Sequence, residues 1–156
     1  MEAMVEMPRK NVPPPLELVK GRIEELLPPD AKREIDAGEV LVVDVRDSDR
    51  YEKGHVAGAV NISSGESARG AHDPSFVEAI EGAGGSRQGR LIVFCGEGNR
   101  SARTADALRN EHGFESAASV IGGLKLWNEL GLPVEGEILV GADDAELGEG
   151  MEGDAT

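Results

Sequence analysis

Cysteine is nearly absent from this sequence of 156 residues, which contains only Cys95. A single cysteine excludes a disulfide framework and a zinc site built from several cysteines. His72 and His112 also have no second ligand at a metal-binding spacing. We therefore expect no metal ion and no cofactor, and the role of Cys95 has to come from its own chemistry.

Positive charge is also scarce, because 30 acidic residues face 16 basic ones and the net charge is −14. Nucleic acid needs clustered Lys and Arg, so it is not an expected partner, and an anionic membrane surface is disfavoured for the same reason. No run approaches the roughly 18 apolar residues of a membrane-spanning helix. The first residues lack the pattern of a secretory signal. These absences favour a cytoplasmic protein.

The acidic residues gather at the C-terminal end. Residues 135–156 hold eight acids, five glycines and no Lys or Arg. High charge with little to bury predicts a disordered acidic tail over residues 136–156, with residues 138–140 as a short stretch that could dock locally. At the other end, residues 1–15 contain four of the eight prolines and predict an irregular arm.

Between these ends, strand and helix patterns alternate. Apolar residues at helical spacing predict a helix from Leu16 to Leu27 that Pro28 and Pro29 end, then a short helix over residues 31–37. Strands are expected at residues 40–45, 59–62, 91–94 and 117–121, helices at 47–53, 74–81, 101–112 and 123–130, and a loop at 63–73. Unbroken apolar strands alternating with helices predict an α/β fold, with a parallel sheet covered on both faces.

Cys95 lies between a buried-type strand and a helix, where ligands bind in open α/β sheets. In the following segment, Gly96 to Ser101, two glycines and an asparagine allow successive backbone N–H groups to point inward at an anion. The helix start and Arg100 add positive charge, and Arg103 lies one turn further on. Such surroundings lower the pKa of a thiol from about 8.5 to roughly 3.5–7.5. The pattern predicts a nucleophilic cysteine in an anion-binding loop.

Two cysteine chemistries fit this loop: attack on phosphorus, and transfer of sulfur through a persulfide. A tetrahedral phosphate needs a wider loop, and cysteine phosphatases place five residues between Cys and Arg, whereas four separate Cys95 from Arg100 here. Those enzymes also commonly have His before the Cys, where this sequence has Phe94. Sulfur transfer is favoured, and a cysteine-dependent phosphatase or arsenate reductase is the minor alternative.

Four blocks match, in order, the motifs of one known family. Residues 41–46 (LVVDVR) resemble a strand ending in Asp-Val-Arg, and residues 51–62 resemble the block Gly-His-Ile-Pro-Gly-Ala-x-Asn-Ile, with Ala57 in place of Pro. Residues 95–101 are similar to the active loop Cys-x-x-Gly-x-Arg-Ser. Residues 120–134 match the closing strand and helix through Gly122-Gly123-x-x-x-Trp127 and Gly-Leu-Pro-Val. Over residues 26–135 the sequence resembles the rhodanese-like sulfurtransferases.

This resemblance implies a five-stranded parallel sheet with helices on both sides. Its first strand would be Leu26-Leu27, which the apolar spacing assigns to a helix end, and residues 1–25 would be an N-terminal arm and helix. The implied activity is transfer of a sulfane sulfur from a donor such as thiosulfate or a persulfide, through Cys95, to a thiol or cyanide. A second hypothesis is a non-enzymatic persulfide relay that docks a sulfur-carrier protein, with the acidic tail as a docking arm.

The resemblance also implies roles for individual residues. Cys95 is the nucleophile and persulfide carrier, and Arg100 acts with it. The backbone N–H groups expected to face the terminal sulfur, together with the side chains that hold the loop and the anion, belong to Gly96, Glu97, Gly98, Asn99, Arg100 and Ser101. Asp44 and Arg46 organise the floor of the site or brace its loops as an ion pair.

Other expectations concern Glu97, His55 and Trp127. Glu97 brings a negative charge into the loop and would repel dianionic thiosulfate, so a persulfide donor fits equally well. His55 has a structural role at a helix end or transfers a proton. Trp127 belongs to the core.

Overall fold

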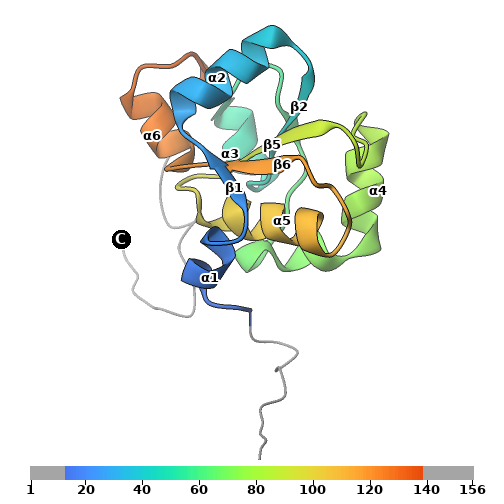
Figure 1. Ribbon diagram of the computed structural model, residues 1–156. Helices are drawn as coiled ribbons and strands as arrows, with labels where there is room; N and C mark the ends of the chain where they lie inside the picture. The colour runs from blue at the N-terminus through green and yellow to red at the C-terminus, as the bar shows by residue number, and fades with distance from the viewer. Residues whose placement is uncertain (1–12, 139–156) are drawn as a thin grey trace, which may run out of the picture.

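The computed structural model describes residues 13–138, and these form one parallel five-stranded sheet with helices on both faces (Figure 1). The expected α/β fold is confirmed. The strand order is β1-β6-β5-β2-β4, and every pairing is parallel. The strands are β1 (Glu24–Leu26), β2 (Val40–Asp44), β4 (Val60–Asn61), β5 (Arg90–Phe94) and β6 (Ala117–Val120). The helices are α1 (Leu16–Lys20), α2 (Pro28–Ala37), α3 (Ser48–Lys53), the 3₁₀ segment η2 (Glu66–His72), α4 (Pro74–Gly82), α5 (Asn99–Asn110) and α6 (Gly123–Glu129).

Alternate residues of the central strands face two separate hydrophobic cores. Leu91 and Val93 of β5 pack with η2, α4 and α5, whereas Ile92 and Phe94 pack with α2 and α6. Phe94 meets the ring of Trp127 edge-on, with the ring centroids 5.2 Å apart. Because both faces of β5 are buried, its sequence is uniformly apolar, as parallel strands require. The last residue of β5 is therefore fixed from both sides immediately before Cys95.

The N-terminal region differs from the helix expected from its apolar spacing. Helix α1 ends at Lys20, and β1 pairs with β6 from Glu24 onward. Pro28 and Pro29 begin α2 rather than end a helix, because proline in the first helical turn lacks only an N–H that would have no partner there. The first strand implied by the family resemblance is present, shifted by about one residue toward the N-terminus.

The segment at residues 63–73, expected as a loop, is largely the helical segment η2. Ser67 and Ala68 both have positive φ values, 51° and 60°, which interrupt the segment. Non-glycine residues rarely adopt this left-handed conformation, so the sequence pattern gives no sign of it. Ala68 is buried against the core, which holds the segment in place beside α5.

The C-terminal end of the described chain is tied to the domain. Strand β7 (Glu135–Gly136) pairs antiparallel with β3 (Gly54–His55), and Ile138 is buried in the core that contains Phe94. The folded unit therefore includes Glu135–Ile138, which the sequence assigns partly to the acidic tail. The rest of that predicted tail and residues 1–12 of the predicted arm lie outside the described residues. Within residues 13–138, no helix is long and apolar enough to cross a membrane.

The contact between β3 and β7 predicts a position-specific cost of substituting Gly54. A Cβ atom at Gly54 would lie 2.2 Å from the carbonyl oxygen of Glu137, so Gly54→Ala has to displace β7. We expect a loss of about 1–3 kcal/mol in the free energy of unfolding, measured by urea denaturation. The matched control is Gly82→Ala at the end of α4, where a Cβ meets nothing within 4 Å. Gly82→Ala should be neutral or stabilise by about 0.4–1 kcal/mol. Equal effects of the two substitutions would contradict the contact.

Candidate active site

Cys95 lies at the carboxyl end of β5, directly before the loop that leads into α5. Its thiol is fully buried, and its sulfur accepts hydrogen bonds from the backbone N–H groups of Gly98, at 3.1 Å, and Ser101, at 3.2 Å. Gly98 has a φ of 98°, which favours glycine and allows the loop to curl back over the sulfur. The expected arrangement of inward-facing N–H groups is present at Gly98, and Ser101 supplies a further one.

A chain of buried hydroxyl groups continues from the sulfur. The Cys95 thiol donates to the Ser101 hydroxyl at 3.3 Å, and the hydroxyl oxygens of Ser101 and Ser119 lie 2.8 Å apart. Ser119, which lies on β6 and is fully buried, is not among the residues that the sequence predicts for the site. The available signal was a polar residue in an otherwise apolar strand. Because all three groups are removed from water, the chain fixes the rotamer of Ser101 beside the sulfur.

The start of α6 holds the other side of the loop. The N–H groups of Leu124 and Lys125 donate to the carbonyl oxygens of Cys95 and Gly96, both at 2.9 Å. This contact is possible only because Gly123 has no side chain, since a Cβ there would lie 2.6 Å from the Cys95 carbonyl oxygen. The adjacent glycines Gly122 and Gly123 therefore have a structural role at the start of α6. They bring the backbone of α6 against the carbonyl side of the loop, while other N–H groups of the loop bind the sulfur.

The Arg100 side chain links the loop to the end of β2. Its guanidinium donates to the carbonyl oxygen of Val45 at 3.2 Å and lies 3.7 Å from the Asp47 carboxylate. Within the same loop, Gly96 is buried, and Glu97 and Asn99 are half-buried. Arg103 is turned toward the N-terminal segment and donates to the carbonyl oxygen of Pro14 at 2.6 Å. Cys95 and Arg100 are thus held at one edge of the sheet.

Asp44 and Arg46 form a closed, fully buried ion pair. The Arg46 guanidinium contacts both carboxylate oxygens of Asp44, at 3.0 and 2.8 Å, and also donates to the carbonyl oxygen of Gly54 at 2.6 Å. The Asn61 amide donates to the backbone carbonyls of both residues. Of the two roles expected for Asp44 and Arg46, organising the floor of the site or bracing its loops as an ion pair, this geometry favours the second. The pair connects the ends of β2 and β4 to β3.

His55 and Trp127 take structural positions. The His55 ring stacks on Tyr51, and its two nitrogens contact the backbone carbonyl of Tyr51 at 2.7 Å and the Glu135 carboxylate at 3.2 Å. Trp127 is buried, and its indole N–H donates to the carbonyl oxygen of Pro133. The core position expected for Trp127 is confirmed. In the described part of the chain, no cluster of His, Cys, Asp and Glu could hold a metal ion.

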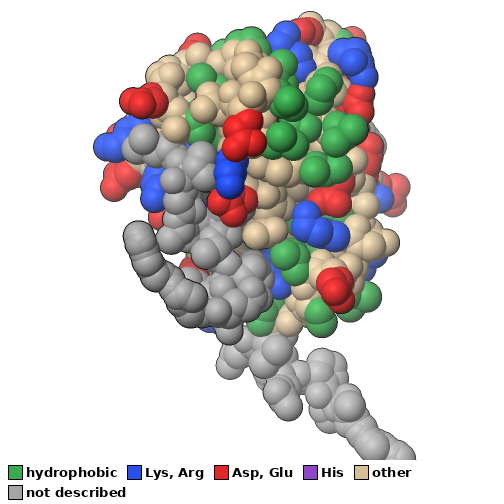
Figure 2. Space-filling model, turned by 90° about the vertical axis from the view of Figure 1, so that its left-hand side faces the viewer, with side chains coloured by type: hydrophobic (Ala, Val, Ile, Leu, Met, Phe, Trp, Pro, Cys, Tyr) green, Lys and Arg blue, Asp and Glu red, His purple; other side chains and the backbone are tan. Residues whose placement is uncertain are grey.

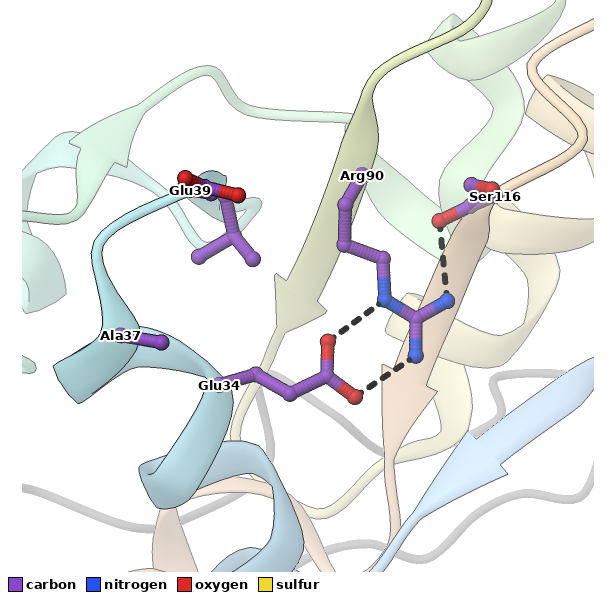
Figure 3. Close-up of a pocket in the computed structure, with 6 residues that line it drawn as sticks. Glu34, Ala37, Glu39, Arg90 and Ser116 are labelled. Atoms are coloured by element: carbon purple, nitrogen blue, oxygen red, sulfur yellow. Dashed lines mark hydrogen bonds and ion pairs between the residues drawn. The ribbon is translucent and has the colours of Figure 1, made fainter.

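A pocket of about 420 Å³ opens at the opposite edge of the sheet from Cys95 (Figure 3). Arg90 lines it, but the nitrogens of its guanidinium are bound by Glu24, Glu34 and the carbonyl oxygen of Ser116. The hydrogen bond from Arg90 lowers the pKa of Glu24, against the opposing effect of burial. Because its donors already have protein partners, Arg90 joins β5 to β1 and α2 and is not an anion site.

Charges of both signs are interspersed on the face of the molecule in Figure 2. Lys and Arg side chains stand among Asp and Glu there and do not form one basic patch. Clustered Lys and Arg are the electrostatic footprint of proteins that bind nucleic acid. This face lacks that footprint among its described side chains.

Comparison with known proteins agrees with the fold. Residues 27–130 match the family model of the rhodanese-like domain. The chain belongs to the rhodanese-like domain family. Over 97 residues, this rhodanese-like domain is 29% identical to the putative sulfur carrier protein YrkF of Bacillus subtilis, covering 62% of this chain and 46% of that one. It therefore spans about half the length of that relative.

Two further proteins show the range of descriptions among similar chains. The thiosulfate sulfurtransferase GlpE of Coxiella burnetii is 32% identical over 89 residues, which cover 57% of this chain and 72% of that protein. A solved structure from Rhodopseudomonas palustris, described as a protein of unknown function and possible tyrosine phosphatase, superposes with a TM-score of 0.63 at 25% identity. It covers 83% of this chain and 100% of that one. Of these three similar proteins, two are named for carrying or transferring sulfur and the third is described as a possible phosphatase.

The contact between Gly123 and the loop predicts a selective effect on Cys95. We expect Gly123→Ala to push α6 away from the loop and to change the rate at which iodoacetamide alkylates Cys95 by at least severalfold. Gly131→Ala is the matched control, because Gly131 also has a positive φ of 73° but a Cβ there meets nothing within 4 Å. Backbone strain should lower the stability of both variants by about 1–2 kcal/mol, and the clash with the loop should add a further loss in Gly123→Ala alone. An unchanged alkylation rate in folded Gly123→Ala would contradict the role given to α6.

Proposed function

We propose that this protein is a sulfurtransferase in which Cys95 carries a sulfane sulfur as a persulfide. The observation that carries the proposal is the Cys95 sulfur with N–H groups of Gly98 and Ser101 on it, at the start of α5. Backbone donors at a helix start stabilise negative charge without adding a proton to the site. The same surroundings suit a thiolate before transfer and an anionic persulfide after it.

The reaction has two steps that return Cys95 to its starting state. The Cys95 thiolate attacks the outer sulfur of thiosulfate, the bond between that sulfur and the sulfonate sulfur breaks, and sulfite leaves with the electron pair. With a persulfide donor, the corresponding thiolate leaves instead. An acceptor thiolate or cyanide then attacks the terminal sulfur of the Cys95 persulfide, and the electron pair of the broken S–S bond returns to Cys95.

The neighbouring groups would have distinct roles in these steps. Arg100 would attract the anionic donor, while its contacts with Val45 and Asp47 keep it at the loop. Gly96, Glu97 and Asn99 supply further backbone of the loop that encloses the terminal sulfur. Asp44 and Arg46 would be positioning residues, because their buried ion pair, together with the hydrogen bond from Arg46 to the Gly54 carbonyl, braces the end of β2. The Nη1 group of Arg46 is buried without a hydrogen-bond partner among the described residues.

A persulfide relay is the second candidate. The similarity to a protein described as a putative sulfur carrier favours it. A relay would exchange sulfur rapidly with a partner such as a sulfur-carrier protein and slowly with thiosulfate. The acidic residues after Ile138 would then serve as a docking arm.

Phosphate chemistry has one supporting observation, the description of the Rhodopseudomonas palustris protein as a possible tyrosine phosphatase. The loop argues against it in this chain. Only four residues separate Cys95 from Arg100, and N–H groups of Gly98 and Ser101 already lie within about 3 Å of the sulfur. A tetrahedral phosphate needs a wider ring of donors than this. Sulfur transfer is therefore the better-supported function.

The direct prediction concerns the mass of the residue that carries the sulfur. After incubation with thiosulfate or glutathione persulfide, the peptide containing Cys95 should gain one sulfur atom, and cyanide should remove it as thiocyanate. Cys95→Ser should remain folded and show neither reaction, because serine cannot form the persulfide. If the wild-type protein gains no sulfur from either donor, sulfur transfer is wrong. If it instead hydrolyses an aryl phosphate in a Cys95-dependent way, the phosphatase alternative replaces it.

The charge of Glu97 predicts a preference between donors. Removing one negative charge from the loop in Glu97→Gln should raise kcat/KM for dianionic thiosulfate by about three- to tenfold. This corresponds to roughly 1 kcal/mol, the interaction of two unit charges about 4 Å apart in water. The gain for glutathione persulfide should be smaller, since it carries less charge near the reacting sulfur. The control Glu39→Gln makes the same charge change at the opposite edge of the sheet and should alter neither value. An equal gain for both donors would show that repulsion at Glu97 does not set donor choice.

A further inference from the structure

We propose that Ser119 is a positioning residue for the reaction, because it directs the hydroxyl group of Ser101 at the Cys95 sulfur. The two serines form a hydroxyl pair that leads from β6 to the sulfur. Their oxygens lie 2.8 Å apart, and the Ser101 oxygen lies 3.3 Å from the sulfur of Cys95. All three residues are fully buried. The proposal rests on the proposed function in one respect, that Cys95 reacts as an anion.

Ser119 lies on β6 at a position where packing calls for an apolar side chain. Helix α5 packs along this strand (Figure 1). Ala117, two residues earlier on the same face, belongs to the core that α5 covers, whereas Val120 belongs to the core on the other face. The hydroxyl of Ser119 has Ser101 as its only partner in the described part of the chain. Because alanine already fills the equivalent position at Ala117, the fold itself does not require a hydroxyl here.

The hydroxyl of Ser101 departs from the usual orientation of a serine in a helix. Serine and threonine in helices often donate to the backbone carbonyl four residues earlier. Thr104 on the same helix does so, with its hydroxyl 2.9 Å from the Arg100 carbonyl oxygen. Ser101 is in the first turn of α5, yet its hydroxyl lies between the Cys95 sulfur and Ser119. The contact with Ser119 accounts for this difference.

The direction of these hydrogen bonds depends on the state of Cys95. While the thiol donates to Ser101, the hydroxyl protons of Ser101 and Ser119 share a single contact, and one of them has no acceptor within residues 13–138. When the sulfur is an anion, both protons have acceptors, because Ser119 donates to Ser101 and Ser101 donates to the sulfur. A buried donor without an acceptor is costly, so the hydroxyl pair favours the anion. Hydrogen bonds in such a row also strengthen one another.

The hydroxyl pair serves both steps of the proposed sulfur transfer. Cys95 is an anion when it attacks the donor, and it becomes an anion again when the acceptor removes the terminal sulfur. With Ser119 donating to its oxygen, Ser101 has its own proton directed at the sulfur. Without Ser119, the Ser101 hydroxyl is free to turn to the backbone carbonyl that serine in a helix often uses. Loss of Ser119 should therefore lower the fraction of Cys95 that is an anion and make Cys95 a poorer leaving group.

Charged side chains near the loop also act on Cys95, and they are the same in every variant of the test. In η2, the residues that share a core with Cys95 are Ala68 and Ala71, which carry no charge. The charged side chains come from the loop, the end of β2 and the start of α6, and they are Glu97, Arg100, Asp44, Arg46, Asp47 and Lys125. A difference between variants at Ser119 consequently reports on the hydroxyl pair.

The test measures how the rate of Cys95 alkylation by iodoacetamide depends on pH in the full chain. Ser119→Ala should move the midpoint of this profile upward by about 0.5–1 pH unit, a three- to tenfold loss of the anion below the midpoint. Ser101→Ala should give a shift at least as large, and the double variant should add nothing to it. Thr104→Val removes a buried hydroxyl that bonds to the backbone and is the matched control, which should leave the profile unchanged.

Two variants of equal shape separate the hydroxyl from packing. Ser119→Thr and Ser119→Val add the same bulk to β6, but only threonine keeps a hydroxyl. Ser119→Thr should retain the wild-type midpoint, and Ser119→Val should show the shift of Ser119→Ala. The proposal is overturned if Ser119→Ala leaves the midpoint unchanged, or if Ser119→Thr and Ser119→Val, both folded, shift it equally.

Sulfur gain at Cys95 is a separate readout that tests the proposed function. A shifted profile in Ser119→Ala, with no sulfur gain in the wild-type protein, would retain the role of Ser119 and reject sulfur transfer. Sulfur gain with an unchanged profile would retain sulfur transfer and reject the role of Ser119. If both hold, the persulfide of Ser119→Ala should pass its sulfur to cyanide about three- to tenfold more slowly, the size expected when part of one hydrogen bond to a charged group is lost. Thr104→Val should keep the wild-type rate.

Discussion

The packing of the α6 backbone against the cysteine loop is the constraint on which the site depends. Leu124 and Lys125 hold the carbonyl groups of Cys95 and Gly96, and Gly123 makes room for this contact. With those carbonyls bound, N–H groups of the loop are available for the sulfur. Trp127 on α6 in turn packs against Phe94, the residue before Cys95. One short helix therefore fixes the nucleophile through both hydrogen bonds and core packing.

Burial of the polar groups around the loop explains why so few charges can organise the site. Asp44, Arg46, Ser101 and Ser119 are all nearly inaccessible to water. Buried polar groups are costly unless they are paired, so each of them has a defined partner and a fixed orientation. In a protein with a strong negative net charge, the local positive potential at Cys95 then comes mainly from backbone N–H groups and Arg100. This arrangement is independent of the overall charge.

The sequence contains most of the information for the sheet and for the loop. Both faces of β2 and β5 are buried, so their apolar runs are recognisable, and the residues of the loop are adjacent in the chain. The predictions made from the sequence are wrong where tertiary contacts override the local pattern. Leu26 follows helical spacing but joins β1 because β6 offers a pairing edge, and Ala68 takes a left-handed conformation because the core holds it. Ser119 is linked to Cys95 through the Ser101 hydroxyl only in the folded protein, and no local sequence motif predicts this contact.

We propose that the loop from Cys95 to Ser101 encloses the terminal sulfur of a Cys95 persulfide. A crystal structure of the protein after reaction with a sulfane-sulfur donor tests it most directly. We expect one additional sulfur atom bonded to Cys95, enclosed by the loop and within hydrogen-bonding distance of its backbone N–H groups, with α6 still bound to the carbonyls of Cys95 and Gly96. A sulfur atom that points away from the loop, or a Cys95 that carries none after reaction, would contradict the account.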